Sequence, residues 1–188
     1  MTISNQLTIM RIVLIPIFVV VYFLPIPYAN WISWFIFAIA AVTDWLDGYL
    51  ARKLGQMSNL GAFLDPVADK LLVLVAFILV VWAYGTVWAM AAAILTVSRE
   101  ITISALREWM AQRNLRAKVA VGPVGKWKTM IQLVGLGTLI VTSRSKVPFA
   151  EPIGITLLWF SVFLALYSMV QYLLAAKSAL LSSEMSAS

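Results

Sequence analysis

The sequence predicts an all-α protein that crosses a membrane with six helices and has its active site at the cytoplasmic end of the helix bundle. Of its 188 residues, 62% are hydrophobic and only 12% are charged. The mean hydropathy of +0.93 is far above the range of soluble domains. Six apolar segments are each long enough to span a bilayer, and half of the acidic residues lie between Asp44 and Asp69.

The six predicted spans cover about 7–25, 30–52, 62–83, 87–111, 122–142 and 151–176. The first contains one charge, Arg11, and continues to Pro25 without a small-residue cleavage site, which predicts a retained helix rather than a cleaved signal peptide. The other five are separated by short polar or turn-forming stretches. We expect residues 1–180 to form one membrane domain and residues 181–188 to be a flexible polar tail.

Loop charges predict the orientation of these spans. Basic residues follow the second and fourth spans: Arg52, Lys53, Arg113, Arg116 and Lys118. The connections at 25–30 and 83–87 carry no charge, so the positive-inside rule places the even-numbered connections and both termini in the cytoplasm. The connection with Arg144, Lys146 and Glu151 runs against this pattern.

The composition also limits the chemistry. The chain has no cysteine and no histidine, which excludes disulfides, thiolate metal sites and the usual zinc ligands. Any bound metal must be a hard cation held by oxygen atoms. The net charge of +6 comes from dispersed basic residues, which membrane topology explains better than nucleic-acid binding.

The second predicted helix places two carboxylates beside two small residues. Asp44, Asp47, Gly48 and Ala51 have the spacing i, i+3, i+4, i+7 and so share one helix face. This face predicts a shallow recess where a ligand approaches the backbone while the acids hold a cation. Arg52 lies along the same edge and could pair with a phosphate or with the acids.

The third predicted helix begins near Gly61 and adds two acids one turn apart, Asp65 and Asp69. If the second and third helices form an antiparallel pair, all four acids meet at the cytoplasmic mouth. Four such charges repel one another by several kcal/mol unless a cation compensates them, and two divalent ions would balance the charge. The alternative for any single aspartate is a helix cap or a salt bridge at the rim.

The pattern D44-x2-D47-G48-x2-A51-R52-x8-G61-x3-D65-x3-D69 resembles the signature of the CDP-alcohol phosphotransferases at every fixed position. Outside it, "AVTDWLDG", "GAFLDPVADK", "REITISALREW", "GKWKT" and "YSMVQYL" are similar to bacterial phosphatidylglycerophosphate synthases. The similarity extends over most of the chain.

The resemblance implies a function for each signature position. It implies metal binding by Asp44, Asp47, Asp65 and Asp69, with magnesium or manganese bridging the diphosphate of the donor, and a general-base role for Asp69. It implies cytidine nucleotide contacts for Gly48, Ala51, Arg52 and Gly61. The implied reaction joins CDP-diacylglycerol to glycerol 3-phosphate and gives phosphatidylglycerophosphate and CMP, in a homodimer of the bacterial inner membrane.

Basic residues inside the fourth and fifth spans need a partner or a cavity, because charge in a bilayer is costly. A small dianion would satisfy several of them. The resemblance likewise places the acceptor phosphate there, and we expect Arg99, Arg107, Lys126 and Lys128 to bind it. Alternatively, the arginines pair with acids of other helices and the lysines reach the lipid headgroups. Glu100 and Glu108 are expected to orient these arginines rather than to catalyse.

Three other functions are compatible with parts of this pattern. A divalent-cation transporter also has intramembrane acids, but the outer halves of the second and third spans are apolar. A lipid-binding scaffold would not need Asp69. The same chemistry could also use another acceptor, such as inositol phosphate or serine.

Overall fold

The structure is a computed structural model that describes residues 3–54, 59–112, 124–145 and 147–185. Over these ranges the chain forms six α-helices and no strand, which confirms the predicted fold class. The helices are α1 (Ile3–Phe23), α2 (Ala29–Leu54), α3 (Asn59–Tyr84), α4 (Val87–Gln112), α5 (Val124–Thr142) and α6 (Ala150–Met185). The last helix therefore continues through residues 181–185 of the segment expected to be a tail.

The apolar character of the helices makes this a membrane protein. By length and composition α1, α4 and α6 can each cross a membrane, and shorter apolar stretches occupy Ala29–Thr43, Lys70–Tyr84 and Trp127–Thr142. Large apolar side chains are exposed on many helix faces, for example Phe35, Ile101 and Phe163. Such exposure fits contact with lipid rather than water. The arrangement of six complete spans stays a prediction.

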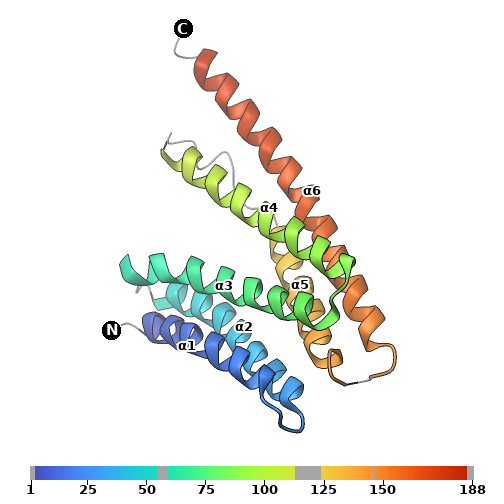
Figure 1. Ribbon diagram of the computed structural model, residues 1–188. Helices are drawn as coiled ribbons and strands as arrows, with labels where there is room; N and C mark the ends of the chain where they lie inside the picture. The colour runs from blue at the N-terminus through green and yellow to red at the C-terminus, as the bar shows by residue number, and fades with distance from the viewer. Residues whose placement is uncertain (1–2, 55–58, 113–123, 146, 186–188) are drawn as a thin grey trace.

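Short connections join the helices at one end of the molecule (Figure 1). They are residues 24–28, 85–86 and 143–149. At the end of α3, Gly85 has a φ of 56° and donates its N–H to the carbonyl of Val81 at 3.0 Å. This left-handed residue closes the helix because glycine has no Cβ to clash there. The opposite end carries the beginnings of α1, α3 and α5 and the ends of α2, α4 and α6.

The main core lies among α1, α2, α3 and α5, with parts of α4 and α6. Phe18 of α1 and Phe37 of α2 are almost fully buried, and their ring centroids are 5.7 Å apart. Phe77 of α3 and Leu136 of α5 complete the centre of this cluster. A second, smaller cluster joins α4 to α6 and consists of Ile103, Met110, Tyr172 and Ala176. The core thus fixes the positions of α3, α4 and α5 relative to one another.

Two glycines allow α5 and α6 to cross closely. A Cβ on Gly135 would lie 2.9 Å from the backbone nitrogen of Leu158, and one on Gly154 would lie 3.0 Å from the side chain of Leu139. Small residues at a helix crossing let the backbones approach, which is how helices gain contact in lipid. The α5–α6 pair is therefore a rigid wall beside α4.

Polar side chains tie the helix ends together where the short connections lie. The bonds join Tyr22 to Ser143 (2.8 Å), Asn30 to Ser145 (2.7 Å) and Tyr84 to Thr142 (2.8 Å). Each links one of the first three helices to α5 or to the residues directly after it. These hydroxyl and amide groups are partly or fully buried, and the hydrogen bonds replace those that they would otherwise make with water.

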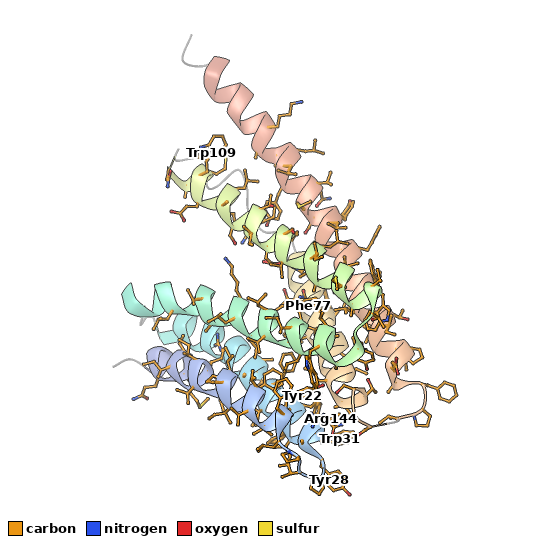
Figure 2. The ribbon with its side chains drawn as sticks, viewed as in Figure 1. Tyr22, Tyr28, Trp31, Phe77, Trp109 and Arg144 are labelled. Atoms are coloured by element: carbon orange, nitrogen blue, oxygen red, sulfur yellow. The ribbon has the colours of Figure 1, made fainter. Side chains whose placement is uncertain are left out.

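Arg144 belongs to the same end and explains the exception to the loop-charge pattern. Its guanidinium carbon lies 5.0 Å from the ring centroid of Tyr22, and its Nη1 donates to the carbonyl of Leu24 at 3.5 Å. Figure 2 shows Tyr22 and Arg144 next to each other. A cation over an aromatic face gains about 0.5–1 kcal/mol at an exposed site. The charge therefore has a structural partner that does not depend on which side of the membrane it faces.

The helices are not parallel along their whole length. In Figure 1, α4 and α6 diverge from α1, α2 and α3 toward the end where α3 begins, and α6 extends past the other helices. With 36 residues, α6 is the longest helix of the described chain. The divergence leaves α3, α4 and α5 as the walls of the site.

Candidate functional site

The acidic motif lies at the end of the molecule opposite the short connections. Asp44, Asp47, Gly48, Ala51 and Arg52 are on α2, as the sequence predicts. The remaining motif positions, Gly61, Asp65 and Asp69, are on α3. Because α2 and α3 are antiparallel neighbours that pack together, both parts of the motif come to the same end.

The side chains of these eight residues lie outside the part of the chain that the structure describes, so their predicted roles stay predictions. Among the side chains that are described, no group of three or more His, Cys, Asp or Glu could hold a metal ion. The side chains of the four aspartates are not among those described, so this absence does not test the predicted metal site.

A cavity of about 500 Å³ lies between α3, α4 and α5. Its polar lining consists of Lys70 from α3, Thr96, Glu100 and Ser104 from α4, and Lys128, Thr129 and Gln132 from α5. Its apolar lining consists of Leu71, Val73, Leu74, Val97, Ile101 and Ala105. Since Lys70 directly follows Asp69 on α3, the cavity begins beside the last acid of the motif. Its walls combine cationic groups with aliphatic surface.

Lys70 connects two walls of the cavity. Its exposed ammonium donates a hydrogen bond of 2.6 Å to the hydroxyl of Ser104. This bond joins α3 to α4 on the side where the two helices diverge. A lysine ammonium has three donors, so a bond to one hydroxyl leaves capacity for an anion.

Lys128 and Glu100 form an ion pair between α5 and α4 in the same cavity. The ammonium of Lys128 is 2.5 Å from Oε1 of Glu100, and only 4% of the lysine side chain is exposed. The same oxygen accepts a bond of 2.8 Å from Nη1 of Arg99. One carboxylate therefore accepts hydrogen bonds from two buried cations, which leaves the group with a net charge of +1.

Arg99 is directed toward α6. Its Nη2 donates to the hydroxyl of Ser168 at 2.7 Å and its Nε to the carbonyl of Ala165 at 3.3 Å. Arg99 does not line the cavity. Its predicted contact with the acceptor phosphate stays a prediction, and what the structure adds is a contact with α6.

Arg107, two residues beyond the last α4 residue of the cavity lining, also contacts α6. Its Nη2 donates to the hydroxyl of Tyr172 at 2.9 Å, and its guanidinium carbon lies 5.0 Å from the ring centroid. The arginine side chain is exposed. Lys126, the fourth predicted phosphate ligand, is in the first turn of α5, and its side chain lies outside the described part.

Of the four predicted phosphate ligands, the structure therefore brings only Lys128 to the wall of the cavity among those with described side chains. Sequence reasoning missed the contributions of Lys70, Ser104 and Gln132. Their signal is helical spacing: Thr96, Glu100 and Ser104 recur every four residues on α4, and Lys128 and Gln132 do so on α5. Polar residues repeating at this interval within an apolar span mark an inward face.

This arrangement suits an amphiphilic ligand. Lys70 and Lys128 can attract an anionic group, whereas Leu71, Leu74 and Ile101 offer surface to hydrocarbon. The carboxylate of Glu100 keeps the wall from being uniformly positive. Hence the cavity favours a molecule whose charged part lies near the motif end.

Comparisons with known proteins point to one family. A family model described as CDP-alcohol phosphatidyltransferase matches residues 1–167. A relative from Haemophilus influenzae is 50% identical over 175 residues, covering 93% of each chain. Relatives from Salmonella typhimurium and Escherichia coli strain K12 are 49% and 47% identical over 179 residues, which are 95% of this chain and 97% of theirs. All three bear the name CDP-diacylglycerol–glycerol-3-phosphate 3-phosphatidyltransferase.

Proposed function

The chain belongs to the CDP-alcohol phosphatidyltransferase family and is a transferase, and on this premise we propose that it transfers a phosphatidyl group from CDP-diacylglycerol to glycerol 3-phosphate. The products are phosphatidylglycerophosphate and CMP. The relatives named for this reaction support the proposal because each is about half identical to this chain over nearly its whole length. Family membership also decides against the transporter and the scaffold.

The observation that carries the proposal is the intact acidic motif on the ends of two packed helices, next to a cavity with Lys70 and Lys128 in its wall. Nucleotide diphosphate, acceptor phosphate and lipid chains need different surroundings. The motif end supplies carboxylates, the polar lining supplies cations, and the aliphatic lining supplies apolar surface. In this proposal the motif end and the adjoining cavity together provide all three.

In the proposed reaction the acceptor hydroxyl attacks the phosphorus atom that carries diacylglycerol. The bond from this phosphorus to the bridging oxygen of the diphosphate breaks, and CMP leaves with the bonding electrons. Asp69 takes the proton of the attacking hydroxyl as general base. Gly48, Ala51, Arg52 and Gly61 bind the cytidine nucleotide.

The donor set of the motif fits a divalent metal. Asp44, Asp47, Asp65 and Asp69 supply hard oxygen ligands on two packed helices, in a chain without histidine or cysteine. The family generally uses divalent metal ions. Two magnesium or manganese ions bound here would neutralise charge on the diphosphate.

Lys126, Lys128 and Arg107 are proposed to bind the phosphate of the acceptor, with Lys128 nearest to the cavity, whereas Arg99 is directed away from the cavity toward α6. Electrostatic attraction to these cations favours a phosphorylated acceptor over serine. We further propose that the enzyme is a homodimer of the bacterial inner membrane with both termini in the cytoplasm. The lipid donor then enters from the inner leaflet and the soluble acceptor enters from water.

The test is an assay of the purified protein in detergent micelles with CDP-diacylglycerol and labelled glycerol 3-phosphate. Labelled phosphatidylglycerophosphate and CMP are expected in equal amounts, only with magnesium or manganese. Turnover that survives excess chelator would contradict the metal mechanism. Turnover with inositol phosphate or serine, but not with glycerol 3-phosphate, would reassign the acceptor.

A further inference from the structure

Three charged side chains from two helices form a connected group beside the cavity. Oε1 of Glu100 accepts hydrogen bonds from Nη1 of Arg99 at 2.8 Å and from the ammonium of Lys128 at 2.5 Å. The exposed fraction is 6% for Arg99 and 4% for Lys128, but 33% for Glu100. The carboxylate is therefore the most exposed member of the group.

Helix packing alone does not require such a group. Burying charges costs free energy that their attraction only partly returns, and apolar side chains of similar size usually hold helices together at least as well. Here α5 and α4 are both already packed on α6, through the close glycine crossing of α5 with α6 and through the cluster of α4 and α6 around Met110 and Tyr172. The three charges thus point to a role beyond joining helices.

The two ends of the group face different surroundings. Glu100 and Lys128 line the cavity, whereas Arg99 is directed away from it to Ala165 and Ser168 of α6. An arginine that donates hydrogen bonds from three of its nitrogen atoms to three acceptors has little freedom to move. Arg99 therefore fixes the carboxylate, and the carboxylate fixes the ammonium of Lys128.

We propose that Glu100 is a positioning residue that holds the ammonium of Lys128 in the cavity wall for the phosphate of the acceptor, and that Arg99 holds Glu100. The inference rests on the proposed function, because it needs an anionic acceptor in this cavity. It assigns Arg99 to the support of the site. A lysine side chain has four rotatable bonds. An ammonium that no neighbouring group holds in place would therefore lose part of its binding free energy to conformational entropy when the phosphate binds.

Replacement of Glu100 by glutamine tests the proposal because the two side chains have the same shape. Glu100→Gln is expected to raise the KM for glycerol 3-phosphate about tenfold and to change the KM for CDP-diacylglycerol less than twofold. Glu151→Gln is the matched control, since Glu151 is an exposed carboxylate in the first turn of α6. Equal changes in both KM values for Glu100→Gln would overturn the proposal.

A double-mutant cycle asks whether Glu100 acts through Lys128. In a Lys128→Met background, Glu100→Gln is expected to raise the acceptor KM less than twofold further, because its effect has already been lost. An additive tenfold rise would mean that Glu100 acts independently of Lys128 and would reject the positioning role. If turnover is too slow, the rise in melting temperature caused by saturating glycerol 3-phosphate replaces KM as the readout.

Two further variants keep all three charges. Ser168→Ala removes one bond to Arg99 and is expected to raise the acceptor KM two- to threefold, again without a change for the donor. Arg99→Lys, which cannot reach all three partners at once, should resemble Glu100→Gln rather than wild type. If both variants lower the melting temperature but leave the acceptor KM unchanged, the group is purely structural. Because wild-type turnover is measured in the same series, failure of the proposed function is seen separately.

Discussion

The ammonium of Lys70 on α3 donates a hydrogen bond of 2.6 Å to the hydroxyl of Ser104 on α4, across the cavity between the two helices. Lys70 is also the residue after Asp69, the proposed general base. Adjacent positions on a helix point about 100° apart. Through Lys70, the bond links α4 to the turn of α3 that carries Asp69.

Lys70→Met should reduce kcat/KM about tenfold, because it removes a cation from the cavity while keeping the length of the side chain. Ser104→Ala should cost only about twofold, since one exposed hydrogen bond contributes roughly 0.5 kcal/mol. Steady-state kinetics on both variants gives the comparison. If the two substitutions have the same small effect, Lys70 acts only by joining α3 to α4.

Asp69→Asn should lower kcat by at least about a hundredfold, because an amide cannot accept the proton of the acceptor hydroxyl. The loss is expected to persist when magnesium is raised to saturation, which separates the base from a weakened metal site. Binding of CDP-diacylglycerol, followed as an increase in melting temperature, should remain. A kcat within threefold of wild type would mean that another group takes the proton.

Arg107→Ala should raise the KM for glycerol 3-phosphate more than the KM for CDP-diacylglycerol. Since Arg107 also contacts Tyr172, Tyr172→Phe is the matched control: it removes the hydroxyl partner and keeps the arginine and the ring. We expect this control to leave both KM values within twofold. Should Tyr172→Phe reproduce the effect of Arg107→Ala, the arginine would serve the α4–α6 contact rather than the acceptor.

Gly135→Val should destabilise the protein by about 1–3 kcal/mol, because its Cβ would meet the backbone nitrogen of Leu158 at 2.9 Å. The measurement is thermal unfolding in detergent micelles. Val134→Leu is the control, since Val134 is the preceding residue and is 55% exposed. An unchanged melting temperature for Gly135→Val would show that α5 and α6 can separate without loss.

Cysteine labelling can test the predicted orientation, since the natural chain contains no cysteine. A cysteine at Phe149, which is 82% exposed at the end with the short connections, should react with a membrane-impermeant maleimide added to intact cells. A cysteine at the exposed Lys177 near the other end of α6 should react only after permeabilisation. The reverse pattern would invert the topology.

The sequence predicted the helices well because each is a long apolar run between turn-forming or charged residues. The second predicted span, 30–52, corresponds to Ala29–Leu54, and the fourth, 87–111, to Val87–Gln112. The sixth is longer than predicted. Its apolar stretch ends near Lys177, but serine, alanine and leucine continue the helix to Met185.

The partners of the buried charges could not be predicted in the same way. Helical periodicity says which residues share a face, but it does not say which helix lies opposite that face. The partners of Arg99 on α6 are 66 and 69 residues away in the chain. Likewise, Lys128 could be assigned to an anion from its charge, but its pairing with Glu100 depends on where α5 lies relative to α4.

Helix α6 has a consequence for the surroundings of the protein. At 1.5 Å per residue its 36 residues measure about 54 Å, whereas the hydrocarbon layer is about 30 Å thick. Even a strong tilt cannot keep the whole rod within the fatty-acyl region. At least one end of α6 therefore projects past the hydrocarbon layer, and a fluorescent reporter fused after the C-terminus would report whether it is the end that carries Met185.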